Sequence, residues 1–342
     1  MARPRDDRRI VFLGISATGH GGIQAFNRRV AAGLATLDNR VDVAMRADQG
    51  TGAFARAALR LLPTADLLLL GHVNLLPLAL LHRLVRPGGR RILFAHGIEI
   101  WGDPAYRRVR RWEPAMLRGA IDQVAVVSGY SRGRMAEAFG LSAARFTLFP
   151  NAVDLPAEPT PPAARRQRLV LAVSRLGAGE REKHLDALIR ALPLVPDARL
   201  TIVGEGALRE ELARLAQEVG VGARVDLPGA LGAAALAHAY ATASVFALPS
   251  SKEGFGIVYL EAWANGLPVI GSRFGAGGEV IRDGVDGFTV DPADIPSLAD
   301  RMQRLLDDPS LAQAMAVAGR ARVARDYSGP AFVANLRALV GS

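Results

Sequence analysis

The sequence predicts two doubly wound α/β domains, each built on a parallel sheet, and three observations lead to this fold class. Short apolar segments alternate with amphipathic helical segments along the chain, which is the pattern of parallel sheets covered by helices on both faces. The length of 342 residues suits two domains, each with its own core. Between the halves lies Leu155–Arg168, which contains four prolines and has little periodicity, so we expect a linker there.

The predicted strands are short apolar segments, five in the first half of the chain and six in the second. Those of the first half are Arg9–Ile15, Asp42–Met45, Asp66–Leu70, Arg91–Ala95 and Gln123–Val127. Those of the second half are Arg168–Val173, Arg199–Val203, Arg224–Leu227, Val245–Leu248, Pro268–Gly271 and Gly287–Val290. We expect one domain over residues 1–152, onto which a C-terminal helix at about 327–342 could pack back, and a second over residues 153–326. Ligands of such domains bind at the carboxyl ends of the strands, here in a cleft across which the two domains face each other.

The composition excludes several kinds of protein. The chain has no cysteine, which excludes disulfides, thiolate zinc sites, iron–sulfur clusters and a cysteine nucleophile. A hydrophobic fraction of 50% argues against intrinsic disorder. The charged N-terminus leads directly into a strand, so we expect no signal peptide. The apolar stretch Asp66–Val85 is interrupted by polar residues, glycine and proline, and it is interpreted as a strand, a turn and a short helix instead of a membrane span.

The net charge of +9 is unevenly distributed. Residues 1–150 carry 22 basic and 11 acidic side chains, whereas the rest of the chain carries 20 basic and 22 acidic ones. All the excess positive charge therefore belongs to the first half. This asymmetry predicts an anionic partner for the first domain: a membrane surface, a phosphorylated substrate or a nucleic acid.

Two glycine-rich turns follow predicted strands, one in each half. The first contains Gly21 and Gly22 and precedes a helix from Ile23, and the second is Gly275–Glu279. Glycines at a strand-to-helix turn let a phosphate approach the backbone amides and the positive end of the helix. A tight turn that needs glycine for its backbone angles is the alternative. Because there is one such turn in each domain, we favour two turns that hold one phosphorylated ligand.

The segment 249–262 carries two carboxylates at a suggestive spacing. Glu253 lies in a loop that includes Gly254, Phe255 and Gly256, and Glu261 lies inside the following helix. Eight residues of helix cover about 12 Å, so the two carboxylates can reach opposite ends of an extended ligand. A carboxylate accepts hydrogen bonds from two vicinal hydroxyls, such as those of a ribose or a hexose. The alternative, a helix cap and a solvated Glu, is weakened by the apolar neighbours of Glu261.

Arg175 and Lys183 form a second candidate pair, this time of cations. Arg175 follows the first strand of the second half, and Lys183 comes eight residues later. Lys183 is one of only two lysines, against forty arginines, which suggests that a compact charge is needed there. No Asp-x-Asp occurs and the six histidines are scattered, so we expect no metal site. The two cations could neutralise a diphosphate in place of a metal ion.

The chain resembles the family 4 retaining glycosyltransferases, which have the GT-B fold of two facing Rossmann-like domains. The resemblance spans roughly residues 10–335, and its motifs follow the family's order. Asn151-Ala152 and His184 depart from the family's usual glycines at two of these motifs. The matching segments are His96-Gly97-Ile98-Glu99, Val127-Ser128-Gly129-Tyr130-Ser131, Pro150-Asn151-Ala152-Val153-Asp154, Ser174-Arg175-Leu176 with Lys183, Val203-Gly204-Glu205-Gly206, Glu253 with Glu261, and Gly287-Phe288.

The resemblance implies transfer of a sugar from a nucleotide-diphosphate donor, with retention at the anomeric carbon and without an obligatory metal or other cofactor. It maps Arg175 and Lys183 onto the donor diphosphate, and Glu261 onto the nucleotide ribose. It assigns the donor sugar and its phosphate to Glu253 and the loop Gly254-Phe255-Gly256, and it assigns the nucleobase to the turn Gly204-Glu205-Gly206. Gly21 and Gly22 would approach the donor phosphate from the first domain, and His96 would lie beside the sugar.

Two features of the first half are open to more than one interpretation. An isolated histidine is usually structural, but His96 stands at the carboxyl end of a predicted strand, which favours function. The segment Trp101–Trp112 mixes four arginines with three aromatic residues. That mixture suits an anionic membrane interface, but an ordinary solvated helix face is slightly favoured over it, and nucleic-acid binding is a third alternative.

The sequence thus predicts a glycosyltransferase that uses a UDP- or GDP-sugar and adds a sugar to an anionic or lipid-linked glycan acceptor in cell-surface glycoconjugate synthesis. A nucleotide-sugar epimerase on the same fold, and a non-enzymatic nucleic-acid- or membrane-binding module, are the alternatives. No nucleic-acid partner is expected for the enzyme. We expect a cytoplasmic location, and a peripheral position on the inner face of the cytoplasmic membrane is left open.

Overall fold

The chain forms two compact units. The computed structural model describes residues 8–18, 21–104, 106–157 and 168–341. Unit 1 comprises Met1–Ala152 and Gly329–Ser342, and unit 2 comprises Val153–Ser328, so the chain passes between the units twice. Most of the expected linker lies outside the described residues.

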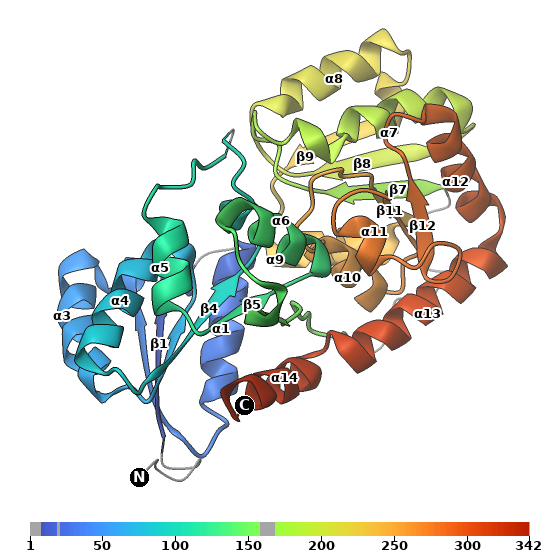
Figure 1. Ribbon diagram of the computed structural model, residues 1–342. Helices are drawn as coiled ribbons and strands as arrows, with labels where there is room; N and C mark the ends of the chain where they lie inside the picture. Colours follow the sequence, from blue (N-terminus) through green and yellow to red (C-terminus); the bar gives the residue numbers. More distant parts are fainter. Residues whose placement is uncertain (1–7, 19–20, 105, 158–167, 342) are drawn as a thin grey trace. The chain divides into compact units, whose positions relative to one another are not determined.

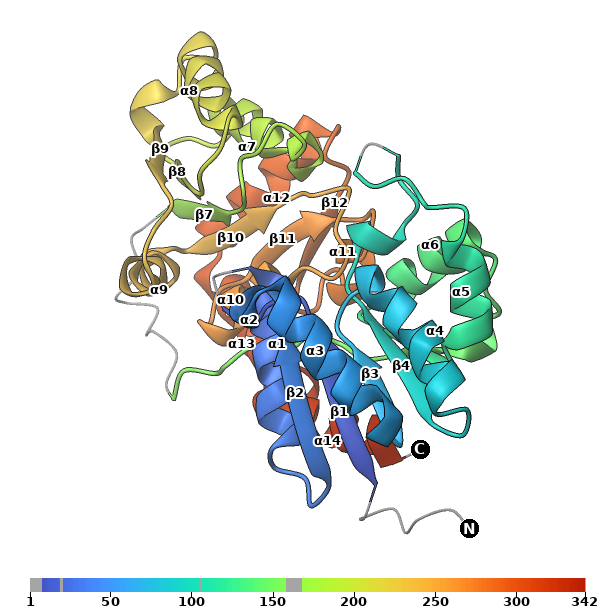
Figure 2. The same ribbon diagram turned by 90° about the vertical axis from the view of Figure 1, so that its left-hand side faces the viewer.

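Unit 1 is built on a six-stranded parallel sheet with the strand order β2-β1-β3-β4-β5-β6 (Figures 1 and 2). Its strands are β1 (Arg9–Gly14), β2 (Arg40–Met45), β3 (Leu67–Leu70), β4 (Arg90–Ala95), β5 (Gln123–Val126) and β6 (Phe146–Leu148). Its helices are α1 (Gly22–Leu34), α2 (Arg46–Gln49), α3 (Thr51–Leu61), α4 (Leu76–Val85), α5 (Glu113–Ala120), α6 (Gly129–Phe139) and α14 (Gly329–Gly341).

The central strand β3 shows why an apolar run becomes the middle of this sheet. It consists of four leucines, all buried. Because successive side chains of a strand point to opposite faces, Leu68 and Leu70 enter one core and Leu67 and Leu69 enter the other. A strand buried on both faces carries no alternation of polar residues.

Different helices cover the two faces of the unit 1 sheet. Residues of α3, α4, α5 and α6 share one core, and residues of α1 and α14 share the other (Figure 1). The second core contains a cluster of phenylalanines, in which Phe332 of α14 lies 5.5 Å from Phe26 and 4.9 Å from Phe149 between ring centroids, each pair edge to face. Edge-to-face pairs of this kind stabilise beyond their buried area. The last helix of the chain is therefore part of the core of unit 1.

Unit 2 has a second six-stranded parallel sheet, with the order β12-β11-β10-β7-β8-β9. Its strands are β7 (Leu169–Val173), β8 (Arg199–Val203), β9 (Val225–Gly229), β10 (Val245–Leu248), β11 (Val269–Ser272) and β12 (Gly287–Val290). Its helices are α7 (Leu185–Ala191), α8 (Leu208–Glu218), α9 (Ala233–Thr242), α10 (Ile257–Ala264), α11 (Gly277–Val280), α12 (Ile295–Asp307) and α13 (Pro309–Asp326).

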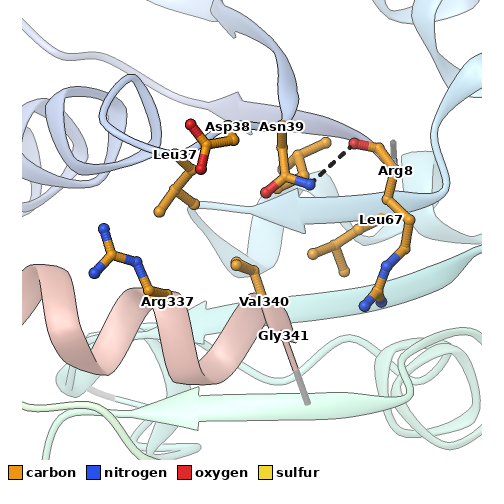
Figure 3. Close-up of a pocket in the computed structure, with 9 residues that line it drawn as sticks. Arg8, Leu37, Asp38, Asn39, Leu67, Arg337, Val340 and Gly341 are labelled. Carbon is orange, nitrogen blue, oxygen red and sulfur yellow. Dashed lines mark hydrogen bonds between the residues drawn. The ribbon is translucent and has the colours of Figure 1, made fainter. Parts of the chain in front are cut away.

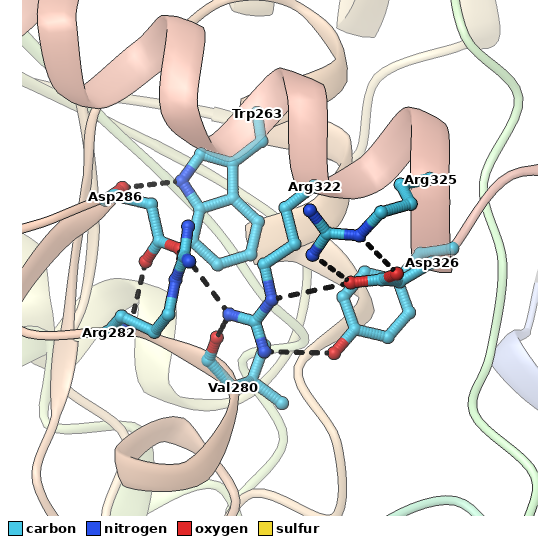
Figure 4. Close-up of polar contacts among 8 residues, drawn as sticks. Trp263, Val280, Arg282, Asp286, Arg322, Arg325 and Asp326 are labelled. Carbon is cyan, nitrogen blue, oxygen red and sulfur yellow. Dashed lines mark hydrogen bonds and ion pairs between the residues drawn. The ribbon is translucent and has the colours of Figure 1, made fainter.

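A buried polar cluster fixes α13 to the rest of unit 2 (Figure 4). The Asp286 carboxylate is fully buried and accepts a hydrogen bond of 2.6 Å from Arg282 Nε, and Nη1 of Arg322 lies 3.4 Å away. Trp263 Nε1 donates to the backbone oxygen of Asp286 at 2.7 Å. A buried carboxylate is tolerated only when it is paired. Gly319 of α13 leaves room for the Trp263 ring, which a Cβ would approach to 2.1 Å.

The predicted doubly wound α/β class is confirmed. All eleven predicted strands are present, and none of their ends differs from the prediction by more than two residues. The strand β6, three residues long and at the edge of the sheet, was not predicted from the sequence. Asp66–Val85 forms β3, a 3-10 turn and α4, as expected. In the part of the chain that the structure describes, no helix is both long enough and apolar enough to cross a membrane.

Candidate functional site

In unit 2 the predicted donor-site residues follow three neighbouring strands at their carboxyl ends. Arg175 follows β7, the turn 204–206 follows β8, and Glu253 follows β10. Since β7 lies between β10 and β8, the three loops leave the same edge of one parallel sheet. This is the edge at which doubly wound sheets bind ligands.

Lys183 and Glu253 form an ion pair at this edge. Nζ of Lys183 lies 2.8 Å from Oε2 of Glu253, and the side chains are only 16% and 17% exposed. Burial lowers the Lys183 pKa, but the charge of Glu253 and its hydrogen bond outweigh burial, so the pKa lies above its ordinary value. Lys183 is therefore a permanent cation. Its 3-10 turn is held to the Glu253 loop by the backbone hydrogen bond from Ser251 N to Glu182 O, 2.9 Å long.

Arg175 is also paired with a carboxylate, which the sequence analysis did not identify. Nη2 of Arg175 lies 2.5 Å from Oε1 of Glu180, whose side chain is 9% exposed, whereas that of Arg175 is 79% exposed. The backbone oxygen of Glu180 accepts a hydrogen bond of 3.0 Å from Lys183 N. Glu180 thus connects the two candidate diphosphate-binding cations. Glu180 lies close in the sequence to both Arg175 and Lys183, and this proximity could have suggested it as their partner.

The glycines of the turn after β8 have a structural reason. Gly204 and Gly206 have φ of +151° and +148°, which non-glycine residues rarely adopt. A Cβ on Gly204 would lie 1.7 Å from the backbone oxygen of Ser174, and one on Gly206 would lie 2.3 Å from that of Leu176. The turn therefore packs directly on the loop that carries Arg175. Glu205, between the glycines, accepts a backbone hydrogen bond of 3.0 Å from Leu176 N.

The second glycine-rich turn supports the Glu253 loop. The backbone nitrogen of Ala276 donates to the backbone oxygen of Glu253 at 3.0 Å, and a Cβ on Gly275 would lie 3.1 Å from Glu253 N. At the end of the loop, Gly256 has φ of +88° and caps α10. Phe255 is buried, and its ring centroid lies 5.7 Å from that of Tyr327. Gly254 lies in the same loop.

Glu261 has a partner that the sequence did not reveal. Tyr240 of α9 is buried, and its hydroxyl donates to Oε2 of Glu261 at 2.8 Å. Burial raises the pKa of Glu261 above its ordinary value, although the hydrogen bond from Tyr240 acts in the opposite direction. The hydrogen bond fixes one carboxylate oxygen, which leaves Oε1 as a ligand acceptor. Tyr240 is the one aromatic residue of the alanine-rich helix α9, which could have drawn attention to it.

In unit 1 the first glycine turn lies at the start of α1. Gly21 is the N-cap and Gly22 the first residue of the helix, and both are exposed. A Cβ on Gly22 would meet nothing within 4 Å, so the fold does not require glycine there. The loop before the turn is held by Asp48, whose carboxylate accepts from Ala17 N at 3.0 Å and from Thr18 Oγ1 at 2.8 Å. These hydrogen bonds hold the Asp48 pKa below its ordinary value.

His96 follows β4 at the carboxyl edge of the unit 1 sheet. Its Nε2 lies 3.1 Å from the backbone oxygen of Gly71, which follows the adjacent strand β3. Burial lowers the His96 pKa against the opposing charge of Glu99, so the ring is neutral at pH 7. Because a carbonyl oxygen only accepts, Nε2 carries the proton and Nδ1 is an acceptor. Phe26 packs against the ring at 4.5 Å between centroids.

One cavity of unit 1 lies away from these residues. A cavity of about 190 Å³ in unit 1 lies at the amino ends of β1 and β3, against the end of α14 (Figure 3). Strands of a parallel sheet point in one direction, so this cavity is at the edge opposite to that of His96 and Gly22. Among the described residues no group of three or more His, Asp or Glu side chains is placed to hold a metal ion.

Comparison with known proteins identifies the family. The chain matches the family described as Glycosyl transferases group 1 over residues 159–322. A GDP-mannose-dependent alpha-(1-6)-phosphatidylinositol monomannoside mannosyltransferase of Mycolicibacterium smegmatis is 39% identical over 270 residues, which are 71% of this chain and 68% of that relative. This chain is a family 4 glycosyltransferase. The enzyme of the same name from Mycobacterium tuberculosis is 36% identical to this glycosyltransferase over 285 residues, 76% of the chain and 72% of the relative.

Solved structures confirm the predicted GT-B fold of this glycosyltransferase. The UDP complex of HepE from Anabaena superposes with a TM-score of 0.78 at 18% identity, covering 97% of this chain and 99% of that one. Sucrose-phosphate synthase from Thermosynechococcus elongatus also gives a TM-score of 0.78, at 21% identity and with 97% and 98% coverage. The relatives support a nucleotide-sugar-dependent transferase over an epimerase or a non-enzymatic binding module.

Proposed function

We propose that this glycosyltransferase moves mannose from GDP-mannose to a lipid-linked acceptor of the phosphatidylinositol mannoside type, with retention and without a metal ion. The relatives that are 39% and 36% identical carry names with this donor and this class of acceptor. The observation that carries the proposal for the site is the paired arrangement of cations in unit 2. Arg175 and Lys183 are each held by a carboxylate at the edge of the sheet where a ligand binds.

In this proposal the groups that bind the nucleotide and the diphosphate belong to unit 2. Arg175 and Lys183 bind the diphosphate, and their carboxylate partners keep the cations in place before the donor arrives. Glu261 accepts hydrogen bonds from the ribose hydroxyls, and the turn 204–206 lies against the base. The loop 253–256 holds the mannose and its phosphate. In unit 1, a Cβ on Gly22 at the start of α1 would meet nothing within 4 Å, which leaves room for a phosphate near the start of that helix.

The chemistry follows from these groups. The bond between the anomeric carbon and the leaving phosphate oxygen breaks, and the acceptor oxygen bonds to the same face of that carbon. The proton of the acceptor hydroxyl passes to the leaving phosphate, so no protein base is needed. Arg175 and Lys183 stabilise the negative charge that grows on the diphosphate, the role that a metal ion has in other transferases. Neutral His96, with Nδ1 as an acceptor, orients a sugar hydroxyl.

The proposed location follows from the proposed acceptor. A glycolipid acceptor is confined to a membrane, whereas GDP-mannose is a soluble cytoplasmic metabolite. We therefore place the reaction at the cytoplasmic face of the membrane, with the enzyme bound there peripherally. The excess positive charge of residues 1–150 supports contact between unit 1 and an anionic surface.

Donor binding tests the proposal directly. At a hundred times its Kd, GDP-mannose is expected to raise the free energy of unfolding by about 2.7 kcal/mol, which raises the Tm by roughly 5–10 °C for a unit of this size. The measurement is a thermal shift in EDTA with GDP-mannose, GDP, UDP and UDP-glucose. A larger shift with the uridine compounds than with the guanosine compounds would contradict the proposed donor. The anomeric configuration of the product, read by NMR, tests retention.

The contact between Tyr240 and Glu261 predicts a pH effect on donor binding. Ionised Glu261 is the form that accepts two ribose hydroxyls, so donor affinity is present above its pKa and is lost as the pH falls through it. Because burial raises that pKa, the loss is expected at a higher pH than the ordinary value of about 4.3. Tyr240→Phe removes the hydrogen bond that lowers the Glu261 pKa. In this variant the loss of donor affinity on acidification, the acid limb of the binding profile, should therefore occur at a still higher pH.

Titration of GDP affinity between acid and neutral pH measures this effect. Phe at position 240 can keep the stacking on Phe246, so the variant isolates the hydroxyl. As a reference, Glu261→Gln should weaken binding about 10- to 100-fold at neutral pH and abolish the acid limb. An acid limb that survives in Glu261→Gln would show that another group titrates and that Glu261 does not bind the ribose.

A further inference from the structure

The loop between β4 and α5 of unit 1, described over residues 101–104 and 106–112, makes contacts with buried groups on its inner side (Figure 1, the teal segment before α5). The carboxylate of the fully buried Glu113 contacts two residues of this loop. Its Oε1 forms an ion pair with Arg107, and its Oε2 accepts a hydrogen bond of 3.0 Å from Arg110 N. Nη1 of Arg107 also donates to the backbone oxygen of Glu99 at 3.3 Å. A buried carboxylate is costly to desolvate, and here both of its oxygens hold one loop conformation.

Packing fixes the same loop against α6. Trp101 is buried, donates from Nε1 to Ser131 Oγ at 3.2 Å, and lies 5.3 Å from Tyr130 between ring centroids. Gly102 has φ of +70°, and a Cβ there would lie 2.7 Å from the Cβ of Ala138. These contacts hold the described residues at the start of the loop against α6. Trp101 and Arg107, two members of the basic and aromatic segment of the sequence, face inward.

The outer side of the loop carries cations that have no anionic partner. Arg108, Arg110 and Arg111 are exposed, and within the described ranges none of them forms an ion pair. The Arg110 guanidinium lies over the ring of Trp112, 5.5 Å from its centroid. Three guanidinium groups within four residues repel one another unless an anion lies between them.

The loop is also connected to the candidate site of unit 1. Arg107 binds the Glu99 backbone, and Oε1 of Glu99 accepts a hydrogen bond of 2.6 Å from His96 N. The arginines thus lie on the segment that continues from the turn carrying His96. A phosphate group bound by the arginines would hold its lipid at the same sheet edge as His96.

We propose that the outer side of this loop, formed by Arg108, Arg110 and Arg111, binds the headgroup phosphates of an anionic membrane and is the membrane contact of unit 1. This proposal rests on the lipid-linked acceptor of the proposed function and deepens it. Guanidinium groups bind phosphate oxygens in bidentate geometry. The half-buried Trp112 and the exposed Tyr106 have the apolar body and polar tip typical of side chains at a membrane interface. An aromatic ring stacked on Arg110 suits a membrane interface. A nucleic acid would need basic residues along a longer stretch of the surface, because its phosphates follow one another along the strand.

Vesicle flotation of the full chain tests the proposal. The wild type is expected to bind phosphatidylcholine vesicles that contain about one fifth phosphatidylinositol, less so at high salt, and not vesicles of phosphatidylcholine alone. The triple variant R108Q/R110Q/R111Q should bind the anionic vesicles about a hundredfold more weakly, since each cation near such a surface contributes a factor of about five. The matched control is R56Q/R60Q/R83Q, which removes three exposed arginines of α3 and α4 in the same unit and should bind like the wild type.

The other outcomes overturn the proposal. Equal binding by the triple variant and the wild type would exclude the loop, and equal loss in the control would show an effect of net charge alone. Tighter binding to single-stranded RNA than to the vesicles would assign the loop to nucleic acid, and complete competition by millimolar inorganic phosphate would indicate a soluble ligand. The Tm of each variant checks folding. If GDP-mannose does not raise the Tm of the wild type, the proposed function is contradicted. The vesicle measurements on the loop are independent of that result, so the two failures are distinguishable.

Discussion

Lys183→Met is expected to lower kcat about 100- to 1,000-fold, the usual cost of removing one group that stabilises charge in a transition state. It is also expected to destabilise unit 2 by about 2–4 kcal/mol, because Glu253 then remains mostly buried without its cation. Urea denaturation and steady-state kinetics with GDP-mannose measure the two effects.

The double variant K183M/E253Q separates these two effects. Glutamine removes the unpaired charge at position 253, so most of the lost stability should return, whereas kcat should stay low because the cation is still missing. A double variant that regains activity would show that Lys183 acts only by pairing with Glu253. A Lys183→Met enzyme with a kcat within about twofold of the wild type would contradict the assignment of Lys183 to the diphosphate.

Gly204→Ala is expected to destabilise unit 2 by about 3 kcal/mol or more. The new Cβ would lie 1.7 Å from the backbone oxygen of Ser174, and the φ of +151° is unfavourable for any residue with a side chain. Relief of the clash requires movement of the loop after β7, which carries Arg175. Donor affinity should therefore fall as well, which an equilibrium titration with GDP at a temperature below unfolding measures.

Gly220→Ala is the matched control for this variant. Gly220 also has a positive φ, of +75°, but a Cβ there would meet nothing within 4 Å. Its expected cost is backbone strain alone, about 1–2 kcal/mol, with donor affinity unchanged. Equal losses of stability in the two variants would show that the contact between the turn and the β7 loop is easily relaxed.

The strands were predictable because a strand buried on both faces is a continuous apolar segment of the sequence. The four leucines of β3 are an example, and the polar residues after them correctly separated β3 from α4. β6 has no such apolar segment. It is only three residues long, lies at the edge of the sheet, and exposes half of Leu148, so its strand character comes from pairing with β5 and not from its own composition.

Motif and spacing singled out the charged residues of the candidate site, but they did not reveal the side chains that contact these residues in the fold. Glu180 pairs with Arg175 inside an irregular loop, where no helical or strand period relates the two positions. Tyr240 and Glu261 lie on different helices and are brought together only by packing against the sheet. Such contacts depend on tertiary structure, which sequence periodicity does not report.

The contribution of α14 to unit 1 has a consequence for biosynthesis. Phe332 and Leu336 are fully buried in a core whose members outside α14 all precede residue 153, so unit 2 is an insertion within unit 1. A ribosome makes proteins from the N-terminus, and domains fold as they emerge. Unit 2 can complete its core while the helix that unit 1 needs is still untranslated. Until that helix arrives, the nascent chain exposes the aromatic surface of Phe26 and Phe149, which makes this interval the one in which a chaperone would protect the protein from aggregation.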